Sequence, residues 1–192
     1  GMDWGNESTA IIYDYWWNSR NVKTYLIDPS KNDQKGEIIN DRNYQDRYSD
    51  PGDFVTRRNQ YGRSVMAMKD NKVFLLGDGY SDEGQFPFLD EYDLEKKESK
   101  RLYQSAYTNK VESLRDYQVA QNRLLVRIES PTEYPNYYFR NLGKAEGEQL
   151  EQLTDFQNPF KSMQDVHKEV INYKRDDGLD LSATLYLPVG YD

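Results

Sequence analysis

The segment Gly79-Tyr80-Ser81-Asp82-Glu83-Gly84 is the nearest approach in this sequence to the G-x-S-x-G context of a hydrolase nucleophile. Such a serine lies on a sharp turn between a strand and a helix. Here Glu83 occupies the position that needs a small residue, and Phe86-Pro87-Phe88 follows in place of a helix-forming run. A polar loop between strands is therefore the favoured interpretation, and a nucleophilic role for Ser81 is the minor alternative.

The single histidine, His167, has no serine in a nucleophile context that it could serve as general base. Zinc sites require several nitrogen or sulfur ligands, and the sequence contains no cysteine. We therefore expect a structural or exposed histidine, no thiol chemistry, no disulfide and no histidine-based metal site. The lack of cysteine does not assign a compartment.

Carboxylates are concentrated in two polar stretches. Asp46, Asp50 and Asp53 could converge on a hard cation such as calcium, which prefers oxygen ligands. Their spacing lacks the D-x-D-x-D-G pattern of a dedicated calcium loop, so capping of the loop at Pro51-Gly52 is favoured. No carboxylate pair is singled out for glycoside hydrolysis. The second stretch contains Asp78, Asp82 and Glu83, which could likewise bind a hard cation or, as is favoured, cap their loop.

Aromatic side chains could provide a stacking platform for a sugar or a peptide. The candidates are Trp16, Trp17, Tyr134, Tyr137, Tyr138 and Phe139. Neighbouring residues in a strand point to opposite faces, so Trp16 and Trp17 are not expected to share one. Burial in the core of a sheet is the favoured interpretation.

The elements that would position these residues are short strands separated by polar turns. The expected strands are 8–17 paired with 22–28, a short strand at 37–40, 64–69 paired with 72–77, 86–94 paired with 99–105, 123–129 paired with 137–142, and 149–154. A weak repeat, in which a strand ends in Asp or Asn before a polar turn and another strand, recurs at Asp28, Asp93 and Asn141. These markers are 65 and 48 residues apart, near the size of a four-stranded unit. About three such units fit before Phe156.

The last 25 residues contain two strand-like runs on either side of Arg175-Asp176-Asp177-Gly178. Leucine or alanine alternates with polar residues from 179 to 187, which predicts a half-buried strand, and Gly178 permits a tight reversal. An isolated hairpin is marginally stable, so it either packs on the rest of the chain or begins another domain. Before it, apolar residues at 160, 163, 166 and 170 have helical spacing. They predict a short helical turn or an amphipathic turn that covers a sheet edge.

Composition limits the class of protein. Of 192 residues, 36% are hydrophobic, 30% are charged and 17 are tyrosine, which favours a β-rich protein with an aromatic core over a helical bundle. The net charge of −8 argues against nucleic acid as a partner. No apolar run approaches the roughly 18 residues of a membrane span, and the start lacks the pattern of a signal peptide. Gly1 before Met2 is interpreted as the scar of a removed tag.

The C-terminal stretch, with its D-G turn and LYLP-x-GY ending, resembles the opening hairpin of the α/β-hydrolase domain in peptidases of the prolyl oligopeptidase family. DRYSDPGD (46–53), GYSDEGQFPFLDEYDL (79–94) and ESPTEYPNYYFRNL (129–142) look like propeller segments of its glutamyl-peptidase-like branch. The resemblance implies an all-β fold: a partial β-propeller of about three four-stranded antiparallel blades at 1–157. It further implies an inter-domain linker at 158–169 and the first hairpin of a truncated hydrolase domain at 170–192.

The resemblance implies that the parent is a serine peptidase whose Ser-His-Asp triad lies after Asp192, while the propeller restricts access to short or unfolded peptides. Within this chain we expect no catalytic residue, no cofactor and no metal site. The alternative is a stand-alone β-rich binding module for carbohydrate or a protein partner; an enzyme based on its carboxylates is the weakest hypothesis. Three blades do not close a ring, so exposed edges favour self-association or domain swapping. A periplasmic or secreted parent is suggested by family analogy alone.

Overall fold

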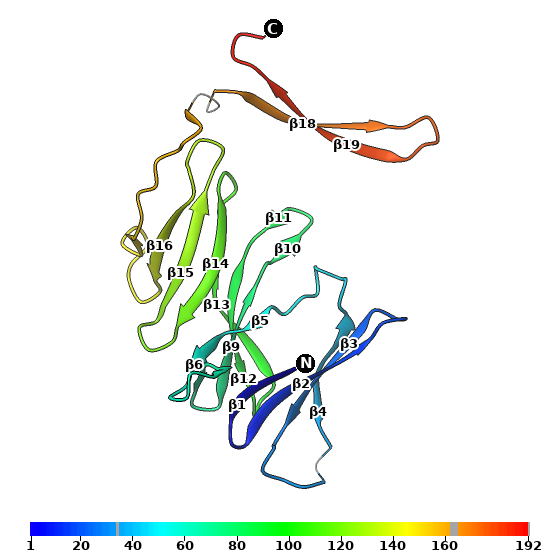
Figure 1. Ribbon diagram of the computed structural model, residues 1–192, viewed down its shortest axis with the longest axis vertical. Coiled ribbons are helices and arrows are strands. Elements are labelled where there is room, and N and C mark those ends of the chain that lie inside the picture. Colours follow the sequence, from blue (N-terminus) through cyan, green and yellow to red (C-terminus); the bar gives the residue numbers. More distant parts are fainter. Residues whose placement is uncertain (34, 162–164, 192) are drawn as a thin grey trace.

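The computed structural model describes residues 1–33, 35–161 and 165–191 (Figure 1). Three antiparallel sheets follow one another along the chain, and a separate hairpin stands beyond the third sheet (Figure 1). Within the described ranges, the regular elements are strands and no α-helix occurs. None of these residues forms a helix that could cross a membrane.

The first sheet contains four strands in chain order. They are β1 (Met2–Asn6), β2 (Thr9–Trp16), β3 (Asn21–Ile27) and β4 (Glu37–Asn43). The predicted pair 8–17 and 22–28 is confirmed, with Ala10 opposite Ile27 and Trp16 opposite Asn21. Strand β4 extends three residues beyond its predicted end at 40, and β1 was not predicted.

The second sheet has the order β13-β12-β9-β5, and β8 also pairs with β9. The strands are β5 (Asp53–Phe54), β8 (Met68–Lys69), β9 (Lys72–Gly77), β12 (Phe88–Asp93) and β13 (Glu98–Gln104). Val73, Phe74 and Leu75 are consecutive and all buried, because both faces of β9 are covered by other sheets. The predicted hairpin of 86–94 with 99–105 is confirmed.

The predicted hairpin of 64–69 with 72–77 is only partly correct. Strand β7 (Ser64–Met66) pairs with β6 (Thr56–Arg58), and only β8 continues onto β9. The chain changes direction at Ala67, whose N–H donates to the carbonyl of Val55 at 2.8 Å. Met66 is thereby fully buried in the core between the first and second sheets.

The third sheet again has four strands in chain order. They are β14 (Val111–Gln118), β15 (Arg123–Glu129), β16 (Asn136–Asn141) and β17 (Leu150–Gln152). Alternate residues of β15, namely Leu124, Val126 and Ile128, are buried, whereas Arg123 and Arg127 lie on the opposite face. The predicted pairing of 123–129 with 137–142 is confirmed, and β14 was not predicted.

Two hydrophobic cores join the three sheets. One lies between the first and second sheets and consists of Ile11, Met66, Val73 and Leu94. The other lies between the second and third sheets and consists of Val55, Ala67, Phe74, Leu89, Tyr117, Leu124, Val126 and Ile128. Each core is therefore shared by neighbouring sheets, as in a propeller. The predicted fold class is confirmed: all-β, with about three four-stranded blades and a C-terminal hairpin.

The C-terminal hairpin consists of β18 (His167–Lys174) and β19 (Asp180–Leu187). Gly178 adopts φ +88° and its N–H donates to the carbonyl of Arg175 at 2.8 Å, which confirms the predicted tight turn. The helical spacing of 160, 163, 166 and 170 is not realised at its end, because Val170 lies in β18; Met163 falls outside the described residues. Strand β18 begins at His167, three residues before the boundary predicted at 170.

Candidate functional site

One end of the stacked sheets carries equivalent turns of the three sheets. The turn after β2, the segment between β9 and β12, and the turn after β15 lie at this end because the sheets have the same strand order. In Figure 1 the excursion that contains β10 and β11 projects from the second sheet on the side where β18 and β19 lie. Loops positioned by a rigid scaffold carry most binding and catalytic residues. We therefore define this end as the candidate functional face.

The excursion of the second sheet is the small hairpin of β10 (Tyr80–Ser81) and β11 (Gly84–Gln85). It begins at Gly79, where φ is +65° and an added Cβ would lie 1.9 Å from the carbonyl oxygen of Phe86. The Ser81 hydroxyl donates to the carbonyl of Gly84 at 3.0 Å. Ser81 thus lies in a two-residue strand that leads to a turn, not in the strand-to-helix turn of a nucleophile.

A contact between loops fixes this hairpin to the first sheet. The guanidinium of Arg47, in the connection 44–52, stacks on the ring of Tyr80 at 4.1 Å. Arg47 Nη2 also lies 3.8 Å from a carboxylate oxygen of Asp78. A cation–π contact and a charge contact at one exposed arginine each contribute on the order of 0.5–1 kcal/mol.

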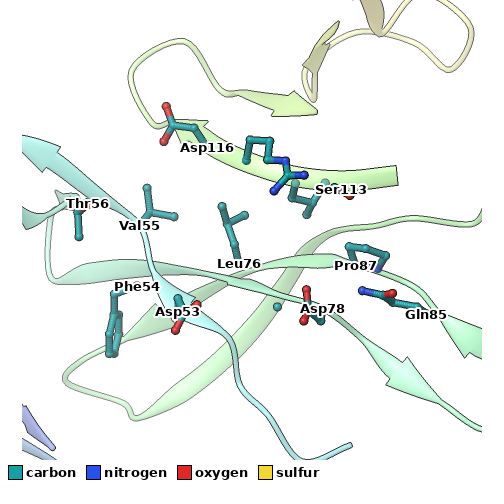
Figure 2. A pocket seen from close by; sticks show the side chains of 13 residues that line it. Asp53, Phe54, Val55, Thr56, Leu76, Asp78, Gln85, Pro87, Ser113 and Asp116 are labelled. Atoms are coloured by element: carbon teal, nitrogen blue, oxygen red, sulfur yellow. The ribbon is translucent and has the colours of Figure 1, made fainter. Parts of the chain in front are cut away.

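A cleft of about 340 Å³ opens between the second and third sheets below these loops (Figure 2). Its walls include Asp53 and Phe54 of β5, Asp78 and Gln85 beside the β10–β11 hairpin, and Ser113 to Asp116 of β14. Most of its accessible surface is polar, so this cleft suits a peptide or another polar ligand more than a hydrophobic one.

The three aspartates of the stretch 46–53 have different roles. Asp46 Oδ1 accepts the N–H of Tyr48 at 3.0 Å, and hydrogen bonding to Ser49 and Tyr48 lowers the pKa of Asp46. Asp50 pairs with Arg42 at 2.7 Å and caps the N–H of Gly52 at 3.0 Å.

Asp53 faces a different environment. Burial, followed by the charges of Asp50, Asp78 and Asp3, raises the pKa of Asp53. Asp50 and Asp53 line a second cleft of about 370 Å³ between the first and second sheets. Among the residues described, no three His, Cys, Asp or Glu side chains are grouped as metal ligands would be.

A buried polar cluster holds the second and third sheets together. Glu112, on β14, is buried and accepts hydrogen bonds from Arg140 of β16 and from the hydroxyl of Tyr103 of β13 at 2.5 Å. Arg140 Nη2 also donates to the hydroxyl of Tyr107 at 3.3 Å. Burial disfavours the charge on Arg140, but Glu112 outweighs it, and the pKa of the guanidinium is raised. Burial and the bond to Glu112 raise the pKa of Tyr103.

His167 starts β18, and its Nε2 lies 3.1 Å from a carboxylate oxygen of Glu169. It is on a different element from Ser81, and no contact between these two residues is present in the described parts of the chain. The hairpin that contains His167 has two unlike faces. One face is mainly apolar and ends in the His167–Glu169 pair, as the cross-strand register shows; its apolar members are Ile171, Tyr173, Leu181, Ala183, Leu185 and Leu187.

The other face of the β18–β19 hairpin is polar and carries cross-strand pairs. Lys174 Nζ lies 2.7 Å from Asp180, and Lys168 Nζ lies 5.6 Å from the ring centre of Tyr186. Lys168 and Tyr186 also line a cleft of about 660 Å³ between the hairpin and the loops of the third sheet. The apolar face is uncovered, with Ile171 39% and Tyr173 50% exposed.

The aromatic candidates do not form one platform. Trp16 and Trp17 are 59% and 74% exposed at the end of the first sheet, so the expectation that they are core residues is wrong. Tyr138 packs against the core between the second and third sheets, as expected. Phe139 lies on the opposite face of the third sheet, beneath the guanidinium of Arg123 at 3.6 Å. Trp16 and Trp17 thus lie at the end of the first sheet, whereas Tyr138 and Phe139 belong to the third.

Sequence reasoning missed Glu112, Arg140 and Arg115. The alternation of 111–118 is broken by a β-bulge between Leu114 and Asp116, and this bulge obscured the strand. A signal for the buried pair was nevertheless present, because a charged residue, Arg140, directly follows the aromatic run Tyr137–Phe139 within one strand.

Consecutive four-stranded antiparallel sheets that share cores, followed by a separate amphipathic hairpin, define a partial β-propeller with a C-terminal extension. Over its whole length the chain is 36% identical to a probable chloroplastic glutamyl endopeptidase of Oryza sativa subsp. japonica. It is 34% identical to the protein of the same name in Arabidopsis thaliana, again over its whole length. These similarities confirm the resemblance to the glutamyl-peptidase-like branch of the prolyl oligopeptidase family.

The chain spans about a fifth of the length of these relatives, 22% and 21% respectively. No family model matches the chain. Among solved structures, the AtxE2 isopeptidase resembles this chain with a TM-score of 0.49 and 10% sequence identity. The match covers 100% of this chain and 26% of the isopeptidase chain.

Proposed function

We propose that this chain is the access-controlling propeller segment of a serine peptidase and that it admits peptides to a downstream Ser-His-Asp hydrolase domain. In this proposal residues 1–157 are propeller, 158–169 are the inter-domain linker and 170–192 open the hydrolase domain. The segment supplies no triad residue. It acts by positioning loops and excluding folded proteins from the active site.

The observation that carries this proposal is the uncovered apolar face of the β18–β19 hairpin. An amphipathic hairpin whose apolar face is exposed is not stable by itself, so another body is expected to cover Ile171, Tyr173 and Leu181. The polar face is already satisfied by its own cross-strand pairs. A strand pair of this kind suits the edge of a larger sheet that packs on one side only.

Control of access requires that the blades stay together. The seam between the second and third sheets is closed by the hydrogen bond from Tyr103 of β13 to buried Glu112, which Arg140 pairs with inside the third sheet. The core around Phe74 and Tyr117, whose ring centres are 5.1 Å apart, closes it further. The contact of Arg47 with Tyr80 closes the loops above the first and second sheets. An extended peptide can pass through an opening that is too narrow for a folded domain. Sheets that stay in contact would keep this opening narrow and so select substrates by size.

The proposal is tested with the longer polypeptide that carries this segment. Exclusion is measured by dividing kcat/KM for a short peptide by kcat/KM for the same sequence placed in a small folded protein. We expect a ratio of about 100 or more in the unmodified enzyme. Arg140→Met, which weakens the seam, is expected to lower this ratio by increasing cleavage of the folded substrate.

The matched control is Arg175→Gln, which removes an exposed ion pair at the hairpin turn and leaves the seam intact. It is expected to keep the ratio unchanged. Equal cleavage of the free and the folded substrate by the unmodified enzyme would contradict control of access. An absence of any serine-dependent cleavage by that polypeptide would contradict the peptidase assignment itself.

A second candidate function is a β-rich binding module or self-associating unit, favoured by the outer face of the first sheet. Met2, Ile12, Tyr25 and Ile38 lie opposite one another across its four strands, on the face that points away from Ile11 and the second sheet. Met2 and Ile38 are 47% and 48% exposed. Exposed apolar faces of this kind mark interaction surfaces. Sedimentation of the isolated chain over a range of concentrations tests for self-association.

A further inference from the structure

Arg115 occupies an unusual backbone position on β14. Leu114 pairs with Val126 of β15 and Asp116 pairs with Leu125, so Arg115 is the extra residue of a β-bulge and faces no partner across the ladder. Bulges redirect a side chain and are over-represented beside functional sites. The side chain of Arg115 is exposed and lines the cleft between the second and third sheets.

The guanidinium of Arg115 has no hydrogen bond, ion pair or aromatic contact within the described parts of the chain. Other arginines of the third sheet are engaged: Arg127 pairs with Glu129, and Arg123 bonds Gln118 and covers Phe139. An arginine presents five N–H donors in a rigid fork that matches a carboxylate with two parallel hydrogen bonds. Arg115 is therefore available to a ligand in the cleft.

The other charges of the cleft determine which ligand fits. Its walls also carry Asp53, Asp78 and Asp116. The charge of Asp78 is partly compensated by Arg47, 3.8 Å away. Figure 2 shows Asp116 on the far side of β14 from Asp53 and Asp78. A ligand with a single carboxylate can pair with the guanidinium, whereas these aspartates repel a ligand with several adjacent negative charges.

We propose that Arg115 binds one carboxylate of a peptide that enters between the second and third sheets, and so makes this cleft a recognition site on the propeller. The inference rests on the proposed function, because it assumes that the segment meets peptides. The carboxylate is either that of an acidic side chain or that of the peptide C-terminus. The Gln85 amide and the Ser113 hydroxyl, on facing walls, are the polar groups expected to bind the peptide backbone.

The test is an NMR titration of the ¹⁵N-labelled chain with three peptides of equal length. One carries a single Glu and has blocked ends, the second has Gln at that position, and the third has no acidic side chain but a free C-terminal carboxylate. We expect saturable shifts of the Arg115 Nε–Hε signal and of the amides of Gly77 and Ser113. One of the two carboxylate peptides is expected to bind about fivefold more tightly than the Gln peptide, the size of a partly exposed charge pair. The peptide that does so identifies the source of the carboxylate.

Arg115→Gln is expected to abolish this preference, and Arg115→Lys to restore part of it. The control Arg63→Gln removes another exposed arginine, in the turn between β6 and β7, and is expected to leave the preference unchanged. Equal affinity for all three peptides, or a preference that survives Arg115→Gln, would overturn the assignment to Arg115. Neither result bears on control of access, which is measured separately by the ratio of peptide to folded-substrate cleavage.

Discussion

Arg140 donates two hydrogen bonds to the same oxygen of Glu112, from Nε at 3.0 Å and from Nη2 at 2.7 Å. The two residues lie on β16 and β14 and are 28 positions apart in the chain. The Glu112 side chain is fully buried and that of Arg140 is 10% exposed. The pair therefore has few solvent contacts, and each charged side chain is stabilised mainly by its partner instead of by water.

Loss of one partner of this pair should be much more costly than loss of both. Arg140→Met leaves a buried carboxylate without its cation, and the free energy of unfolding should fall by about 3–5 kcal/mol. The double variant Glu112→Gln/Arg140→Met should recover part of that loss. Urea unfolding followed by tryptophan fluorescence measures both, with Arg175→Gln as an exposed control that costs less than about 1 kcal/mol. A double variant no more stable than Arg140→Met would contradict this account.

Alkaline pH should destabilise the fold through Tyr13 and Tyr103. Burial, then hydrogen bonds to Asp3 and Glu112 respectively, raise the pKa of both hydroxyls in the folded chain. A raised pKa contributes stability that is complete below the unfolded value, near 10, and is lost as the pH rises above it. The free energy of unfolding should therefore be flat from about pH 8 to 9 and fall above about pH 10. The variant Tyr13→Phe/Tyr103→Phe should show a shallower fall; parallel curves would exclude these two tyrosines.

Gly79 should be essential for the shape of the β10–β11 hairpin. Its φ of +65° disfavours any other residue, and an added Cβ would lie 1.9 Å from the Phe86 carbonyl oxygen. Gly79→Ala should cost about 1–3 kcal/mol and speed hydrogen exchange of the amides of Tyr80 and Gln85. Gly143→Ala is the control, because its Cβ would meet only the Asn122 side chain at 3.8 Å. Unchanged exchange in Gly79→Ala would contradict the prediction.

The apolar face of the C-terminal hairpin should promote association of the isolated chain. Ile171→Thr combined with Tyr173→Thr should reduce the oligomer fraction in sedimentation velocity at least severalfold, with little change in the unfolding midpoint because both side chains are exposed. Val170→Thr is the matched control, since Val170 is 64% exposed but lies on the opposite face. Association that is unaffected by the double substitution would instead direct attention to the outer face of the first sheet.

The sequence predicted the strands whose turns carry clear signals. The pairs β12–β13 and β15–β16 were correct because apolar and aromatic runs flank a charged turn and a Ser-Pro turn. Strand β14 was missed because a β-bulge breaks its alternation and because its buried side includes Glu112, whose partner is remote in sequence. The exposure of Trp16 and Trp17 was also missed, because the apolar character of a side chain does not reveal whether a neighbouring sheet covers it. The bulge at Arg115 has no signal in a single sequence.

The second sheet contributes to both hydrophobic cores, whereas the first and third sheets contribute to one each. Each sheet thus contacts only its immediate neighbours, and the energetics of the array are close to those of a one-dimensional chain of repeats. Such an array can lengthen by gene duplication of one unit, because a new sheet has to match only the adjoining surface.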